Sequence, residues 1–229
     1  VSKDGFFAFG IGRDRKYDIV ITSVKNGKKN IITKKIQKRK YKIQRIDGLP
    51  EKKVTPPKEV YERIKKENKI ISDARSVNSN LTFFKNKFKP PLENAIITGV
   101  YGSQRILNGK PKWQHYGIDF AAKEGTQIKA MLDGTATMVE KDLFYTGGTL
   151  IFDHGHGIST LYMHMQKIYV KKGQKVKQGE VIGTVGSDEK IKLAKKYGCD
   201  EVINYNKENF KDKVLELTNN EGLPVVYLS

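Results

Sequence analysis

The chain has 229 residues, with 43 lysines and arginines against 25 aspartates and glutamates, and carries a formal net charge of +18. A hydrophobic fraction of 38% is sufficient for a packed core and excludes wholesale disorder. The lack of any run of about 18 apolar residues excludes a transmembrane helix within this stretch. The single cysteine, Cys199, excludes an internal disulfide framework and any multi-cysteine zinc site. Because the chain opens on Val1 without an apolar signal segment, we expect a fragment or a processed form.

The positive charge is concentrated near the N-terminus. Between Asp18 and Asp47 there are eight lysines, two arginines and no acidic residue. Modules that read nucleic-acid sequence interleave arginine with aromatic residues, and this stretch has only Tyr41, so sequence-specific nucleic-acid binding is not expected. Two interpretations stay open, namely a lysine-coated strand surface and a surface that attracts an anionic partner, such as an envelope glycan or lipid headgroups.

Residues 1–50 are predicted to form a β-rich and incomplete N-terminal domain. Strands are expected at residues 17–24, 31–36 and 41–46, where β-branched side chains are frequent. The dipeptide Asn26-Gly27 between the first two is a strong hairpin turn signal.

Residues 51–90 are predicted to be a linker that contains one helix. The proline-containing segment 54–57 should be a stiff connector, and residues 58–75 carry apolar side chains at helical spacing. Thr55 is expected to cap this helix, with the two following prolines in its first turn.

Residues 91–187 have short strands and frequent glycines, which is typical of a compact antiparallel β-barrel or sandwich. Residues 188–229 change to an α/β rhythm and are predicted to form a separate tail, with helices at 188–197 and 207–218 and short strands at 201–205 and 225–228. The predicted fold class is therefore mainly β, with a connecting helix and a short α/β C-terminal tail.

The histidines of the chain cluster within fifty residues, at His115, His154, His156 and His164. Together with Asp119 they suggest a metal site or an acid–base site. In a straight strand, residues four apart are separated by about 13 Å. His115 and Asp119 can share one ion only if the backbone bends between them, and Gly117 supplies that freedom.

The motifs around this cluster resemble the lysostaphin/LytM-type zinc metallopeptidase family over about residues 45–187. They occur in the family's order, as Gly99-Val-Tyr-Gly-Ser103, His115-Tyr-Gly-Ile-Asp119, Asp153-His-Gly-His-Gly157, Leu161-Tyr-Met-His164 and Gly179-Glu-Val-Ile-Gly183. The resemblance implies a peptidoglycan endopeptidase with the duplicated hybrid motif fold.

The resemblance also implies a site. His115 and Asp119 match two of the family's three zinc ligands, and His164 matches a catalytic histidine that stabilises or protonates the tetrahedral species. Alternation along this strand is expected to place Leu161, Met163 and Met165 on one face and Tyr162 and His164 on the other. The implied chemistry is hydrolysis of peptide bonds in cell-wall peptidoglycan by a zinc-activated water.

The implied location is the bacterial cell envelope, either periplasmic or membrane-anchored through a missing N-terminus. The expected partner is peptidoglycan or another anionic envelope polymer.

No third zinc ligand can be identified. The triplet His154-Gly-His156 imitates the family's His-x-His motif, but it precedes the strand that ends at His164 and is interpreted as a turn. The family's third ligand should follow residue 186, where Asp188 and Glu189 are better suited to starting a helix than to binding a metal. Zn²⁺ is therefore expected to be weakly held, and activity of this particular chain is doubtful. The alternative is a non-catalytic peptidoglycan-binding or hydrolase-regulating module of the same fold.

The tail over residues 181–229 resembles a piece of the quinone oxidoreductase family of medium-chain dehydrogenases. The motifs that carry this resemblance are Val181-Ile-Gly-Thr-Val-Gly-Ser-Asp-Glu-Lys190 and Leu193-Ala-Lys-Lys-Tyr-Gly-Cys-Asp-Glu-Val-Ile-Asn-Tyr205. The glycine-rich phosphate loop of that family is absent, so NADPH binding is not expected. Residues 181–187 satisfy both families, which suggests that two coding sequences were joined there by recombination or by misassembly of sequence data.

Overall fold

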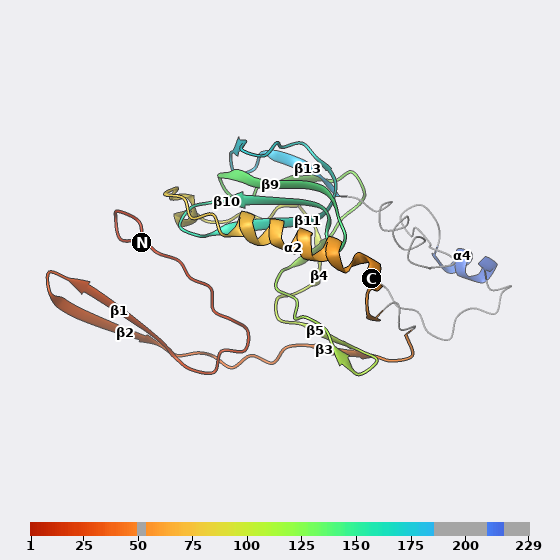
Figure 1. Cartoon of the computed structure of the whole chain (residues 1–229), viewed down its shortest axis with the longest axis horizontal. Helices are drawn as coiled ribbons and strands as arrows, with labels where there is room; N and C mark the ends of the chain where they lie inside the picture. The colour runs from red at the N-terminus through yellow and green to blue at the C-terminus, as the bar shows by residue number, and fades with distance from the viewer. Residues whose placement is uncertain (50–53, 186–209, 218–229) are drawn as a thin grey trace. The chain divides into compact units, whose positions relative to one another are not determined.

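The computed structural model describes residues 1–49, 54–185 and 210–217 (Figure 1). The chain divides into two compact units, which are described separately. The larger comprises Val1–Phe6, Thr55–Ile96 and Ala121–Ser229, and the smaller comprises Phe7–Val54 and Ile97–Phe120. The domain boundaries predicted from composition stay a prediction.

A six-stranded antiparallel sheet forms the centre of the larger unit. Its strand order is β12-β9-β10-β11-β13-β8, and it curls into a half-barrel (Figure 1). The strands are β8 (Gln127–Lys129), β9 (Gly134–Leu143), β10 (Gly147–Asp153), β11 (Ser159–Ile168), β12 (Lys175–Val176) and β13 (Val181–Val185). The predicted antiparallel, mainly β architecture is confirmed.

The core of this unit lies along β10, the strand that pairs with both β9 and β11. Leu150, Ile151 and Phe152 are fully buried, because a central strand of a curled sheet is covered on both faces. Other strands of the sheet add further buried apolar side chains, among them Met138 on β9 and Ile182 on β13. This continuous apolar layer provides the main hydrophobic stabilisation of the unit.

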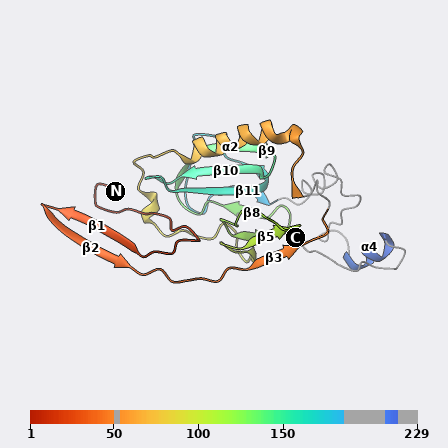
Figure 2. The ribbon, with the colours of Figure 1, turned by 60° about the horizontal axis from the view of Figure 1, so that its bottom comes forward.

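The predicted connecting helix is present as the 3₁₀ turn η1 (Lys58–Val60) followed by α2 (Tyr61–Arg75). It lies along the sheet, where Ala74 joins a cluster with Met138 and Ile151 (Figures 1 and 2). Thr55 does not cap the helix. Thr55 and Pro56 each precede a proline, which disfavours the α region for both, so the helical turn begins only after Pro57, an extended N-cap residue without a side-chain cap.

In the smaller unit, β1 (Ile19–Lys25) and β2 (Lys28–Lys34) form a two-stranded antiparallel hairpin (Figure 2). Its turn residues Asn26 and Gly27 have φ values of 50° and 75°. Two successive residues with positive φ match the right-handed twist of the flanking strands, which is why this dipeptide favours tight hairpins. The predicted hairpin is confirmed.

Two further small sheets complete the structure of this part of the chain. β3 (Ile43–Ile46) pairs in parallel with β5 (Gln104–Leu107), which pairs antiparallel with β6 (Lys110–Pro111). β4 (Ile96–Gly99) pairs with β7 (Asp119–Ala121). The β4–β7 pair brings the backbone of Gly99 next to the carboxylate of Asp119.

The remaining described elements are η2 (Phe83–Lys85) and α4 (Phe210–Leu217). α4 lies inside the helix predicted for residues 207–218, whereas the other tail elements, predicted within 188–205 and 225–228, lie outside the described residues. Among the helices that the structure describes, none has the length and apolarity needed to cross a bilayer.

Candidate metal site

His115 and Asp119 come together at the start of β7. The Nε2 atom of His115 lies 3.1 Å from Oδ1 of Asp119. A straight strand would hold these residues about 13 Å apart, so the chain must bend between them, and it does so at Gly117. The structure thus brings together the two residues expected to bind zinc, although their role as ligands stays a prediction.

The imidazole of His115 is oriented by backbone atoms of its own unit. Its Nδ1 atom lies 3.1 Å from the carbonyl oxygen of Val100, and a carbonyl can only accept, so Nδ1 carries the proton. Nε2 is therefore the ring nitrogen directed toward Asp119, and it is the nitrogen that a metal ion could bind. The backbone N–H of His115 also donates to the Ser103 carbonyl at 2.8 Å. A backbone carbonyl behind the ligating ring is the usual outer partner of a metal-binding histidine.

Gly99 leaves the space that the Asp119 carboxylate occupies. A Cβ atom at position 99 would contact Asp119 Oδ2 and would lie 2.9 Å from its Cγ atom, closer than such atoms normally approach. The absence of a side chain on β4 is thus a steric requirement for the position of the Asp119 carboxylate.

The two side chains are accessible to an ion from solvent. The side chain of His115 is 27% exposed and that of Asp119 is 58% exposed. An imidazole nitrogen with a fixed tautomer and an adjacent carboxylate oxygen fit two positions of a zinc site. In residues 1–49, 54–185 and 210–217, no group of three or more His, Cys, Asp or Glu side chains is placed to hold a metal ion. The segment in which a third ligand is expected lies outside those residues.

His164 lies on β11 in the larger unit, where its side chain is exposed and its φ is 59°. The register between β10 and β11 shifts here, because Gly148 pairs with Met165 while Leu150 pairs with Tyr162. One extra residue therefore bulges from β11. The catalytic role of His164 stays a prediction.

This bulge overturns the expected alternation along β11. Met165 is buried, as is Tyr162, whereas Leu161 and Met163 are each more than one-third exposed. The single-residue insertion shifts every later side chain by one position relative to the pleat.

His154 and His156 lie in the connection between β10 and β11, as predicted. His154 is nevertheless completely buried. Its Nδ1–H donates to the Asp133 carbonyl at 2.7 Å, and its Nε2 accepts from the Thr160 hydroxyl at 2.8 Å. Both ring nitrogens are satisfied by the neutral form, so His154 is a buried structural histidine, which the turn motif alone did not indicate.

Burial lowers the pKa of His154 below its ordinary value of 6.5. Below pH 6.5 His154 is protonated in the unfolded chain but stays neutral in the folded chain until its lowered pKa is reached. The free energy of unfolding therefore falls as pH falls. Below pH 6.5 we expect His154 to add at most about 1.4 kcal/mol per pH unit to the slope of the unfolding free energy against pH. Urea unfolding between pH 7.5 and 5.5 measures it. An unchanged slope in His154→Asn would contradict this assignment.

Comparison with known families gives two matches. Residues 113–197 match peptidase family M23, and residues 172–228 match the zinc-binding dehydrogenase family. The two segments overlap over residues 172–197, at the place where the sequence satisfies both resemblances.

Named relatives support the first match. Peptidoglycan DD-endopeptidase ShyA of Vibrio cholerae is 39% identical over 77 residues, which are 34% of this chain and 18% of ShyA. Peptidoglycan DD-endopeptidase ShyC of the same organism is 33% identical over 107 residues, or 45% of this chain and 24% of ShyC. The chain thus spans about a quarter or less of these curated relatives.

A crystal structure of an M23 peptidase from Pseudomonas aeruginosa is similar in fold. Its TM-score is 0.57 at 22% identity, and the alignment covers 78% of this chain and 66% of that chain. The His115–Asp119 pair lies within the matched segment. Residues 113–197 of this chain thus match peptidase family M23, and the chain has relatives named peptidoglycan DD-endopeptidases.

Proposed function

We propose that the chain carries a zinc metalloendopeptidase-type domain that hydrolyses peptide bonds in bacterial cell-wall peptidoglycan. Two relatives of the chain are named peptidoglycan DD-endopeptidases, and they support this substrate class. The single observation that carries the proposal is the pairing of His115 Nε2 with Asp119 Oδ1 at 3.1 Å. This pairing puts an imidazole nitrogen and a carboxylate oxygen, both common zinc ligands, within reach of one ion.

His115 and Asp119 would hold the zinc ion. When bound, zinc supplies an activated water and polarises the scissile carbonyl. The Val100 carbonyl engages Nδ1 of the His115 ring, so that Nε2, on the side of Asp119, is the nitrogen that would bind zinc. His164 is proposed to stabilise or protonate the reacting peptide, a role for which its exposed imidazole on β11 is accessible.

We propose further that zinc is weakly held and that hydrolysis by this chain is impaired. The proposal rests on the sequence after residue 186, which lacks the histidine-containing segment of the family. Two protein ligands hold zinc less tightly than the three of typical catalytic sites. The location proposed for the domain is the bacterial cell envelope, with peptidoglycan or another anionic polymer as its partner.

Zinc titration of the purified chain, monitored by competition with a weak chelator, tests the site. We expect one weak site that is lost in both His115→Ala and Asp119→Ala. His156→Ala removes a histidine from the β10–β11 turn and is the matched control, so it should retain the site.

A tightly held equivalent of zinc would show that another residue completes the site. That result would contradict impairment and support full peptidase activity, which hydrolysis of purified peptidoglycan would measure. No zinc binding at all, together with co-sedimentation on insoluble peptidoglycan, would favour the non-catalytic module over the enzyme.

A further inference from the structure

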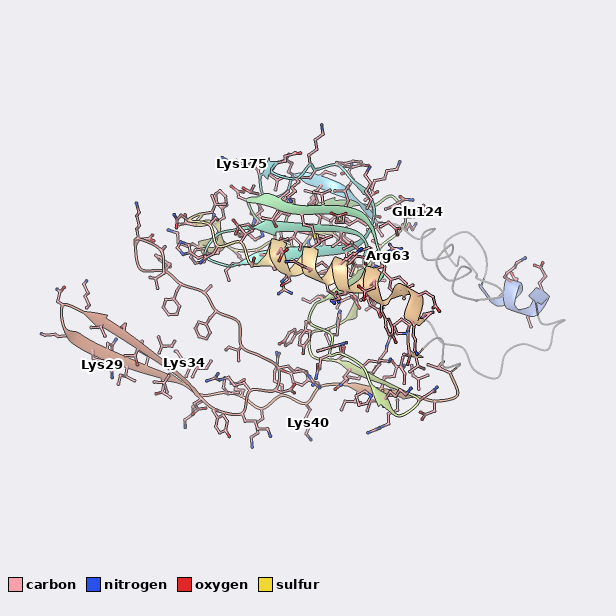
Figure 3. The ribbon with its side chains drawn as sticks, in the orientation of Figure 1. Lys29, Lys34, Lys40, Arg63, Glu124 and Lys175 are labelled. Atoms are coloured by element: carbon pink, nitrogen blue, oxygen red, sulfur yellow. The ribbon has the colours of Figure 1, made fainter. Side chains whose placement is uncertain are left out.

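The hairpin β1–β2 exposes both positive charge and apolar surface. Lys25, Lys28 and Lys29 surround its turn, Lys34 lies at the other end of β2, and all four are exposed. Figure 3 labels Lys29 and Lys34 on the hairpin. Every residue of β2 is exposed, and β1 is mostly exposed as well. The hairpin is a two-stranded sheet, so no third strand covers its edges among the described residues.

The register of the hairpin determines which side chains share a face. Val20 pairs with Thr33, Thr22 pairs with Ile31, and Val24 pairs with Lys29. Because side chains alternate along a strand, these six residues lie on one face. The exposed fractions of Val20, Val24 and Ile31 are 61%, 67% and 56%. This face is thus a short β-branched surface that ends in a lysine at the tip.

The positive charge of the hairpin is not neutralised locally. In the described part of the chain, no ion pair joins a carboxylate to Lys25, Lys28, Lys29 or Lys34. Asp18, the acidic residue nearest in sequence, accepts a hydrogen bond from the backbone N–H of Ile36. The tip therefore presents a concentrated positive potential to an anionic partner.

We propose that this hairpin docks on an anionic lipid surface. Lys29 shares the face of Val20, Val24 and Ile31, and the long side chains of Lys25 and Lys28 at the tip can reach headgroups from the opposite face. Val20, Val24 and Ile31 would enter the boundary between the headgroups and the acyl chains. This division of charge and apolar surface is the one that interfacial amphipathic helices use. The proposal does not depend on zinc or on peptidase activity.

The apolar residues favour a bilayer over a soluble polyanion. A glycan or a nucleic acid would be attracted by the lysines, but it would leave the three β-branched side chains in water. A lipid surface satisfies both features at once, because juxtamembrane lysines gain from anionic headgroups and apolar side chains gain from leaving water.

Flotation of the full chain with vesicles tests the proposal. One set of vesicles is pure phosphatidylcholine, and the other is phosphatidylcholine with anionic phosphatidylglycerol. We expect the chain to bind the vesicles that contain phosphatidylglycerol, and added salt should weaken this binding. Each lysine near the surface contributes about a fivefold gain in partition, so K25Q/K28Q/K29Q should lose about a hundredfold. V20T/V24T/I31T keeps the charge and the β-branching, and should lose about tenfold.

The matched control is K171Q/K172Q/K175Q, which removes the same charge from exposed lysines of the larger unit, including Lys175 (Figure 3). It should bind vesicles nearly as the parent chain does. Circular dichroism and urea unfolding confirm that each variant keeps the fold of the parent.

Three results would overturn the proposal. An equal loss in the control would mean that the total charge of the chain, rather than the hairpin, attracts vesicles. Unchanged binding by V20T/V24T/I31T would mean attraction to polyanions in general, and soluble polyphosphate would then compete fully. No binding to phosphatidylglycerol vesicles would exclude a lipid surface altogether.

Discussion

Replacing Gly99 by alanine is expected to weaken zinc binding by about 10- to 100-fold while leaving the fold intact. The new methyl group would lie 2.9 Å from Asp119 Cγ and closer still to Oδ2. The side chain of Asp119 is 58% exposed, so it should rotate toward solvent rather than strain the sheet. Rotation would separate its carboxylate from His115 Nε2, and the ion would lose one of its ligands.

The measurement is a zinc titration of Gly99→Ala beside the parent chain, with urea unfolding of both proteins. Gly12→Ala is the matched control, because a Cβ atom at that position meets no atom within 4 Å and Gly12 belongs to the same unit. Equal zinc affinities of the parent and Gly99→Ala would contradict a ligand role for Asp119.

Gly155→Ala is expected to lower the free energy of unfolding by about 3 kcal/mol or more. Gly155 has a φ of 96°, which alanine rarely adopts, and its Cβ atom would overlap the carbonyl oxygen of Leu81. The overlap involves backbone, since the Cβ atom would also lie 2.8 Å from the Leu81 Cα atom. No side-chain rotation can relieve such a contact.

The affected contact joins two segments of the larger unit. His156 N–H donates to the Ser79 carbonyl at 2.9 Å, and the Phe84 ring packs edge-on against the His156 ring with centroids 5.2 Å apart. The chain that follows α2 is therefore held close to the β10–β11 turn. Moving Leu81 to admit a methyl group would disturb these contacts as well.

Gly157→Ala separates the cost of the positive φ from the cost of the steric overlap with Leu81. Gly157 has a φ of 74° in the same turn, but its Cβ atom would meet nothing within 4 Å. It should cost about 1 kcal/mol, from backbone conformation alone. Urea unfolding measures both variants. Similar decreases in the free energy of unfolding of Gly155→Ala and Gly157→Ala would mean that the close approach of Leu81 contributes nothing.

Features set by neighbouring residues could be predicted from the sequence. Asn26-Gly27 specifies a tight turn because both residues accept positive φ, and the hairpin forms there. Apolar spacing specifies the helix α2, and the frequent glycines with short strands specify the antiparallel sheet. The His115-x-x-x-Asp119 motif indicated the pair, since a glycine between them permits the bend.

Features that depend on residues distant in the chain became apparent only in the tertiary structure. Gly99 is required for the position of Asp119 because β4 pairs with β7, and no local pattern reports that approach. The buried ring of His154 is satisfied by a hydrogen bond to the carbonyl of Asp133, which lies 21 residues earlier in the chain. The bulge at His164 comes from the register between β10 and β11.

The physical reason for this division is the range of the forces involved. Turn and helix preferences come from steric and hydrogen-bonding constraints within a few residues, and the sequence therefore determined these elements by itself. The tautomer of His115, the space for the Asp119 carboxylate and the burial of His154 depend on contacts between segments that are distant in the chain. Those contacts form only when the protein packs. Packing between distant segments therefore decided the geometry of the candidate site.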